Sequence, residues 1–126
     1  MAAKKIRVLI ADDHRMFAEA LGAILSTDGR IKVVGQAGDG RAALELAQKH
    51  NADVVLMDIA MPVMDGIEAT RAIRDELPAT AVVVVTGSAA TRDVSRARAA
   101  GAAGYVTKDQ IAGDLVQAIL AAAGRS

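Results

Sequence analysis

The sequence contains no cysteine, and Phe17 and Tyr105 are its only aromatic residues. Without cysteine, the chain cannot form a disulfide framework, a thiolate metal site or a thiol nucleophile. The 15 basic and 15 acidic residues cancel, so no net charge attracts the chain to nucleic acid or to an anionic membrane. No apolar run reaches the length of a membrane span. These absences favour a soluble cytoplasmic domain, and a length of 126 residues predicts one domain with a single core.

Short apolar runs alternate with segments of helical period along the chain. The runs are nearly continuous, which is typical of parallel strands covered on both faces; they are Ile6–Ala11, Ile31–Gln36, Val54–Met57, Ala81–Val85 and Tyr105–Thr107. Helical periodicity follows each run. In the first helix it predicts one core-facing set, Phe17, Leu21, Ile24 and Leu25. The helix predicted over about Thr91 to Ala100 has the weakest pattern. We predict a three-layer, doubly wound α/β domain built around a parallel sheet of five strands.

Polar residues stand where four of these strands end. Asp58 directly follows the third run, and the pair Asp12-Asp13 follows the first. Thr86 and Lys108 occupy the same place after the fourth and fifth runs. Ligands of open parallel sheets bind outside the carboxyl ends of the strands. We therefore expect these side chains to form one site.

The residue types of this predicted site favour phosphoryl chemistry with a divalent cation. Clustered carboxylates repel one another until protons or a cation intervene, and oxygen ligands without cysteine or paired histidine favour Mg²⁺, with Mn²⁺ possible, over zinc. Lys108 offers a compact positive charge for a phosphoryl oxygen. The Thr86 hydroxyl and the Gly87 backbone N–H can donate to another oxygen. Asp58 could then act as the nucleophile and form an acyl phosphate.

In order and spacing, these residues resemble the motifs of response-regulator receiver domains. The matching positions are Asp12-Asp13, Asp58, Met61-Pro62, Asp65-Gly66, Thr86 and Lys108. The stretches Asp12–His14 and Gly104–Asp109 look most like the NarL/LuxR-type subgroup, in which the receiver usually precedes a helix-turn-helix DNA-binding domain. The resemblance implies a CheY-like, flavodoxin-like fold with strand order 2-1-3-4-5.

For the metal, the resemblance implies a specific set of ligands. Asp13 and Asp58 would bind Mg²⁺ directly, Asp12 would act mainly through water, and the backbone carbonyl of Ala60 would complete the protein ligands. Asp58 would accept its phosphoryl group from a partner histidine kinase.

The resemblance also implies phosphoryl-binding groups and a switch. Lys108 and Thr86 would contact the phosphoryl group, and the backbone N–H groups of Ile59 and Gly87 would bind it. Thr86 would then move toward it while Tyr105 turns inward and alters the face formed by the fourth helix, the fifth strand and the fifth helix. From the residues alone, Tyr105 is equally a half-buried packing residue.

We expect residues 1–126 to form one receiver domain with an ordered core of about residues 6–122 and no output domain within this chain. The expected role is that of a phosphoacceptor with self-phosphorylation and self-dephosphorylation chemistry, not of an enzyme. A homodimer or an output-domain contact is expected on phosphorylation, and no direct binding of nucleic acid or membrane. The alternatives are a stand-alone receiver and an interaction module that is never phosphorylated.

Other functions fit the strand ends less well. A phosphatase with an aspartate nucleophile needs a second acid two residues later, where this chain has Ala60. A flavin carrier needs a phosphate loop after the first strand, where Asp12-Asp13 would repel phosphate. If Asp58 is phosphorylated, Ala60 and Ser88 are expected to flank the water that attacks the phosphoryl group. Because both are small, neither should exclude this water, and we expect a moderate rate of self-dephosphorylation.

Simpler interpretations apply to several other residues. His14 and His50 have no partner at metal-ligand spacing in the sequence, which predicts two surface residues. Asp65-Gly66 is interpreted as a turn and a helix start, with no further role.

Overall fold

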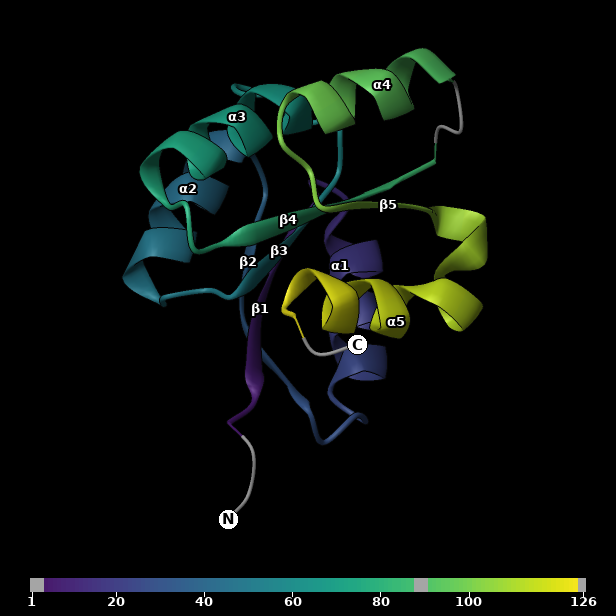
Figure 1. Ribbon diagram of the computed structural model, residues 1–126. Coiled ribbons are helices and arrows are strands. Elements are labelled where there is room, and N and C mark those ends of the chain that lie inside the picture. The colour runs from purple at the N-terminus through teal and green to yellow at the C-terminus, as the bar shows by residue number, and fades with distance from the viewer. Residues whose placement is uncertain (1–3, 88–90, 125–126) are drawn as a thin grey trace.

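The computed structural model describes residues 4–87 and 91–124, and it shows one sheet between two layers of helices (Figure 1). All strand pairs are parallel, and the strand order is β2-β1-β3-β4-β5. The elements in chain order are β1 (Ile6–Ala11), α1 (Arg15–Leu25), β2 (Ile31–Ala37), α2 (Gly40–Lys49), β3 (Val54–Met57), α3 (Gly66–Glu76), β4 (Ala81–Thr86), α4 (Thr91–Ala99), β5 (Gly104–Thr107), the 3₁₀ helix η1 (Lys108–Gln110) and α5 (Ile111–Ala122). The predicted fold class and strand order are confirmed.

The predicted elements differ from the observed ones mainly at their ends. Strand β4 extends through Thr86, so this threonine is the last residue of the strand and does not follow it. The helix with the weakest sequence pattern is present as α4. The short helix η1, which begins at Lys108, has no counterpart in the prediction.

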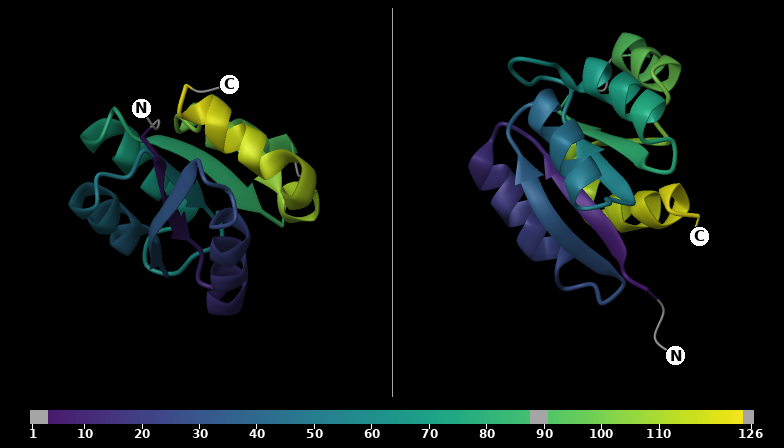
Figure 2. Two further views of the ribbon diagram at one scale, coloured as in Figure 1. Left: turned by 90° about the horizontal axis from the view of Figure 1, so that it is seen from below. Right: turned by 90° about the vertical axis from the view of Figure 1, so that its left-hand side faces the viewer.

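Each face of the sheet has its own hydrophobic cluster. Helices α1 and α5 cover one face, and α2, α3 and α4 cover the other (Figures 1 and 2). Successive strand residues point to opposite faces: Val82 and Val84 join the α2/α3/α4 cluster, whereas Val83 and Val85 join the α1/α5 cluster. The same alternation places Thr86 on the α2/α3/α4 face.

Two expectations about burial are wrong. Ile24 was predicted on the core face of the first helix but is 57% exposed. The buried stripe of α1 is Ala18, Leu21, Gly22 and Leu25, a set with helical spacing that leaves Ile24 at its border. Strand β2 is not continuously buried either, because it is an edge strand of the sheet (Figure 2, right).

Aspartate side chains cap the N-termini of two helices, α2 and α3. Asp39 accepts a hydrogen bond from the Ala42 N–H at 2.8 Å, and Asp65 accepts one from the Glu68 N–H at 2.9 Å. Such capping satisfies backbone donors that have no partner within the helix. Among the described residues, no helix is long and apolar enough to cross a bilayer.

Candidate functional site

Three strand ends bring charged side chains together at the carboxyl end of the sheet. The Lys108 ammonium, just after β5, lies 3.0 Å from Asp12 Oδ2 and 3.8 Å from Asp58 Oδ2. The Asp12 and Asp58 side chains are almost fully buried, with exposed fractions of 4% and 5%. The parallel order of β1, β3 and β5 produces this meeting of residues far apart in the chain.

The two buried aspartates belong to a cluster of candidate metal ligands. Asp12, Asp13, His14 and Asp58 each offer one ligand atom, and these atoms lie within 4.8 Å of one another. Three of the four donors are carboxylate oxygens, which suit Mg²⁺ or Mn²⁺. The donor set therefore fits the divalent cation that the sequence predicts.

Asp12 is the most heavily engaged of these acids. Its Oδ1 accepts a hydrogen bond from the His14 backbone N–H at 2.8 Å, and its Oδ2 pairs with Lys108. Asp13 is more open, with 37% of its side chain exposed. Asp13 is therefore the more accessible of the two adjacent acids for a direct bond to a cation.

His14 is a member of the cluster that the sequence analysis missed. Its side chain is 67% exposed, as expected of a surface residue, but its Nδ1 lies 3.1 Å from Asp12 Oδ1 and 3.3 Å from Asp13 Oδ1. The prediction that it has no partner at ligand spacing is wrong. His14 has an extended backbone and lies directly before α1. This position brings its imidazole ring close to the Asp12 and Asp13 carboxylates. Its position next to the acid pair was the available signal.

The electrostatics of the cluster disfavour a charged Asp58. Burial raises the pKa of the Asp58 carboxyl, and the neighbouring Asp12 and Asp13 carboxylates raise it further. Lys108 and a hydrogen bond from the Ala60 backbone N–H act in the opposite direction on this pKa without reversing the shift. A carboxylate at this position is therefore a candidate for neutralisation by a cation.

Two glycines pack closely against the backbone of Asp58 and of the loop that follows it. A Cβ atom on Gly66 would lie 2.0 Å from the Asp58 carbonyl oxygen, and one on Gly40 would lie 2.4 Å from the Met64 carbonyl oxygen. Both glycines also donate to the loop, Gly66 to the Ile59 carbonyl at 2.9 Å and Gly40 to the Met64 carbonyl at 3.0 Å. The interpretation of Asp65-Gly66 as only a turn and a helix start is incomplete, because Gly66 packs against the backbone of Asp58 itself.

The remaining predicted residues lie around the same rim. Thr86 is buried, Ile59 is half-buried, and Ala60 and Gly87 are exposed. Tyr105 is half-buried and packs against the α2/α3/α4 cluster, on the face to which Thr86 also points. Ser88, expected to flank the attacking water, lies outside the described residues.

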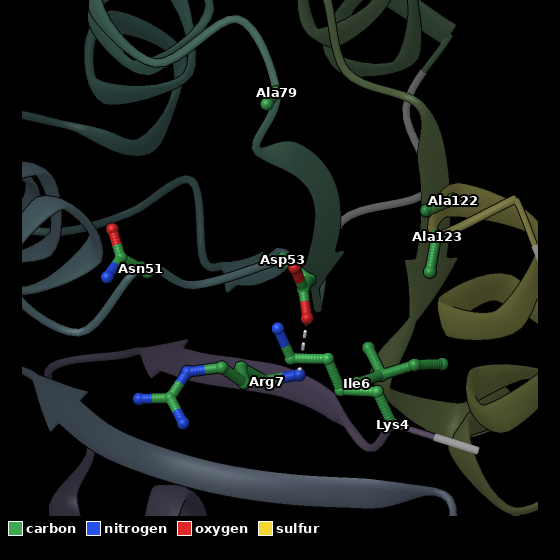
Figure 3. Close-up of a pocket in the computed structure, with 8 residues that line it drawn as sticks. All are labelled: Lys4, Ile6, Arg7, Asn51, Asp53, Ala79, Ala122 and Ala123. Atoms are coloured by element: carbon green, nitrogen blue, oxygen red, sulfur yellow. Dashed lines mark hydrogen bonds between the residues drawn. The ribbon is translucent and has the colours of Figure 1, made fainter.

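Cavity size alone would point to the other end of the sheet. A cavity of about 490 Å³ lies at the amino ends of the strands (Figure 3), and its lining residues are Lys4, Ile6, Arg7, Asn51, Asp53, Ala79, Ala122 and Ala123. The cavity beside Asp12 and Asp13 measures about 210 Å³. The acidic cluster, not the larger space, marks the candidate site.

Comparison with known proteins identifies the family to which this chain belongs. Residues 8–120 match the family model of the response regulator receiver domain. NarL of Mycobacterium tuberculosis H37Rv, a probable transcriptional regulatory protein, is 42% identical over 118 residues, which cover 93% of this chain and 54% of that protein. The transcriptional regulatory protein DegU of Brevibacillus brevis is 38% identical over 115 residues, which cover 91% of this chain and 49% of that protein. The chain thus spans about half the length of these relatives.

Solved structures agree in fold. The signal receiver domain of the M. tuberculosis NarL response regulator superimposes with a TM-score of 0.92 and 39% identity, covering 98% of this chain and 100% of that one. The response regulator domain of Thermotoga maritima CheB gives a TM-score of 0.89 with 32% identity over 96% of this chain and 98% of that one. The chain therefore belongs to the response regulator receiver domain family, and it is of the NarL/LuxR type.

Proposed function

We propose that this domain is a phosphoacceptor in two-component signalling and that Asp58 takes the phosphoryl group from a histidine kinase. The observation that supports this most is the position of Asp58. It is buried in an acidic cluster that suits a divalent cation, and the Lys108 ammonium lies 3.8 Å from its carboxylate. Receiver domains generally bind Mg²⁺ at such a cluster and receive phosphoryl groups from histidine kinases.

The assignment of individual metal ligands is part of the proposal. Asp13 and Asp58 bind Mg²⁺ directly, with the carbonyl of Ala60 as the third protein ligand. The contacts of Asp12 with His14 and Lys108 support its role as a ligand that acts through water. When bound, the cation neutralises the carboxylates and stabilises charge on the phosphoryl oxygens.

The transfer step uses groups that already lie at the rim of the sheet. A carboxylate oxygen of Asp58 attacks phosphorus, an O–P bond forms, and the N–P bond of the phosphohistidine breaks with release of the imidazole. Lys108 pairs with a phosphoryl oxygen, and the Thr86 hydroxyl and the N–H groups of Ile59 and Gly87 donate to the others. With acetyl phosphate as donor, acetate leaves instead.

The readout is proposed to be a change in the α4-β5-α5 surface. Thr86 and Tyr105 share one face of the sheet, and a cavity of about 120 Å³ is lined by Tyr105 together with residues of α4 and of the segment leading to β5. This space supports an inward turn of Tyr105 when Thr86 moves toward the phosphoryl group.

Partners of the whole protein are inferred from its relatives. Several relatives are named as transcriptional regulators and are longer than the matched region. We infer that phosphorylation controls a DNA-binding output domain outside these residues, through a homodimer or an output-domain contact. The predicted cytoplasmic location belongs to the same proposal.

The test is incubation with acetyl phosphate and Mg²⁺, followed by intact mass. We expect one phosphoryl adduct that requires Mg²⁺ and is absent from Asp58→Asn, while Asp75→Asn, an exposed acid of α3, is modified like the wild type. An adduct that persists in Asp58→Asn contradicts the assignment of the acceptor. A complete lack of adduct favours an interaction module that is independent of phosphorylation.

A further inference from the structure

The Lys108 ammonium has a third neighbour besides the two acids. It lies 4.3 Å from the centroid of the Phe17 ring, over its face, within the range of a cation–π interaction. We propose that Phe17 is a positioning residue whose ring holds Lys108 at the acceptor site during phosphoryl transfer. The proposal rests on the function proposed above and adds a residue to its machinery.

The Phe17 ring packs against the hydrophobic cluster on its face of the sheet. Phe17 is in the first turn of α1, which begins three residues after Asp12, and it is half-buried against the α1/α5 cluster, as is Ile111 of α5. Helices α1 and α5 lie on the same face of the sheet (Figure 2, left). A ring packed in this way gives the Lys108 ammonium a preformed contact surface. The Lys108 side chain therefore loses less rotamer freedom when its ammonium is needed for phosphoryl transfer.

The ring also differs from the carboxylates in how it responds to a cation. Among the described residues, Lys108 forms ion pairs with Asp12 and Asp58, and both belong to the cluster that suits Mg²⁺. A bound cation competes for these carboxylate charges and weakens their hold on the ammonium. The face of Phe17 carries no formal charge to neutralise, so its attraction persists. Phe17 therefore matters most when cation and phosphoryl donor are present.

The competing explanation is that Phe17 only fills space beside the core. Three variants separate the two. Phe17→Leu keeps apolar volume but removes the ring, Phe17→Tyr keeps the ring, and Leu25→Val weakens the packing of α1 at a residue that is 1% exposed. A packing role predicts that Phe17→Leu and Leu25→Val behave alike.

The experiment measures the rate of modification by acetyl phosphate with saturating Mg²⁺. We expect Phe17→Leu to be slower by about threefold, whereas Phe17→Tyr and Leu25→Val retain the wild-type rate. In a Lys108→Ala background, Phe17→Leu should cause no further loss, because the ring acts through the ammonium. Equal rates for Phe17→Leu and the wild type overturn the proposal. So does an equal loss in Leu25→Val, or a full additional loss in the Lys108→Ala background.

A spectroscopic readout tests the contact independently of phosphorylation. The ring face should shift the Lys108 Hε proton resonances upfield in the wild type and in Phe17→Tyr, and Phe17→Leu should abolish the shift. An unshifted Lys108 in the wild type contradicts the contact. A shifted Lys108 in a protein that acetyl phosphate never modifies refutes the proposed function but leaves the contact standing, so the two failures are distinguishable.

Discussion

The two ends of the sheet shift the pKa values of their carboxyl groups in opposite directions. At the carboxyl end, burial and the neighbouring Asp12 raise the pKa of Asp58. At the amino end, just before β2, hydrogen bonds from Arg30 lower the pKa of Asp28 to about 2. The amino end thus stabilises the charged form of Asp28. The carboxyl end disfavours the charged form of Asp58 unless a further positive charge is added.

The same contrast holds for the other polar groups. At the amino end, Asp53 accepts a hydrogen bond from the Arg7 N–H at 2.9 Å, and the buried Thr80 hydroxyl donates to the Ala52 carbonyl at 2.8 Å. These groups are satisfied within the protein. The larger of the two cavities described above is also at this end (Figure 3), so the amino end offers space without the charge imbalance found around Asp58.

The largest expected effect comes from crowding the backbone under Asp58. Gly66→Ala places a methyl group 2.0 Å from the Asp58 carbonyl oxygen, and we expect a loss of about 3 kcal/mol in the free energy of unfolding. Urea denaturation measures it. Gly113→Ala is the control, because its Cβ meets no atom within 4 Å, and it should stabilise helix α5 by about 0.5–1 kcal/mol. A Gly66→Ala protein as stable as the wild type would refute the close packing.

Removing one carboxylate at each end should change stability with opposite signs. Without divalent cations near neutral pH, Asp58→Asn should raise the free energy of unfolding by about 1 kcal/mol, because it removes a disfavoured charge. Asp53→Ala should lower it by about 0.5–1.5 kcal/mol through loss of the hydrogen bond to Arg7. Thermal unfolding measures both. Equal signs for the two variants contradict the contrast between the ends.

The pH dependence follows from the direction of the Asp58 shift. Since the folded-state pKa of Asp58 is raised, its charged form destabilises the fold above that pKa, and this penalty disappears below the unfolded value of about 3.9. The advantage of Asp58→Asn should therefore shrink as the pH falls toward about 4. Added Mg²⁺ should stabilise the wild type and leave the variant nearly unchanged. A constant advantage over this range contradicts the electrostatic account.

At the amino end, a neutral polar group should matter independently of any cation. Thr80→Val keeps the shape of a buried residue but removes the donor to the Ala52 carbonyl, and we expect a loss of about 1 kcal/mol. Urea denaturation with and without Mg²⁺ measures it. The loss should be the same in both conditions, and a loss that Mg²⁺ changes would link this end to the cation site.

The smallest effect is expected at the exposed Asp28–Arg30 pair. The folded-state pKa of Asp28 is lowered to about 2 from 3.8, so its contribution to stability is present above the higher value and is lost as the pH falls through the lower one. Asp28→Asn should be slightly less stable than the wild type near neutral pH and equal to it at the acid end. Salt should reduce the difference, and a salt-independent difference would argue against a charge effect.

Much of the fold was predictable from the sequence. Apolar runs such as Val54–Met57 and the periodic segments between them gave the element order, and the parallel arrangement followed from it. The prediction was wrong at Ile24, where an apolar residue is exposed. Apolar spacing marks a helix, but which neighbouring stripe is buried depends on the crossing of α1 over the sheet.

The sequence predicted which residues stand at the strand ends and that they form one site. Asp12, Asp13, Asp58, Thr86 and Lys108 stand at strand ends in the sequence, and the structure places them at one rim. His14, Gly66 and Phe17 acquire their relation to that rim through turns and packing. The adjacency of His14 to the acid pair was visible in the sequence, but the contacts of Gly66 and Phe17 were not.

The sequence by itself determined the order of the elements and the residue types at the strand ends, because both depend on local periodicity and on chemistry that each residue carries. Only the tertiary structure decided the energetics. The distances from Lys108 to Asp12, Asp58 and the Phe17 ring arise from strands and helices far apart in the chain, and so does the burial that raises the pKa of Asp58. Electrostatic interactions depend on distance and on solvent exposure, and the sequence alone contains neither.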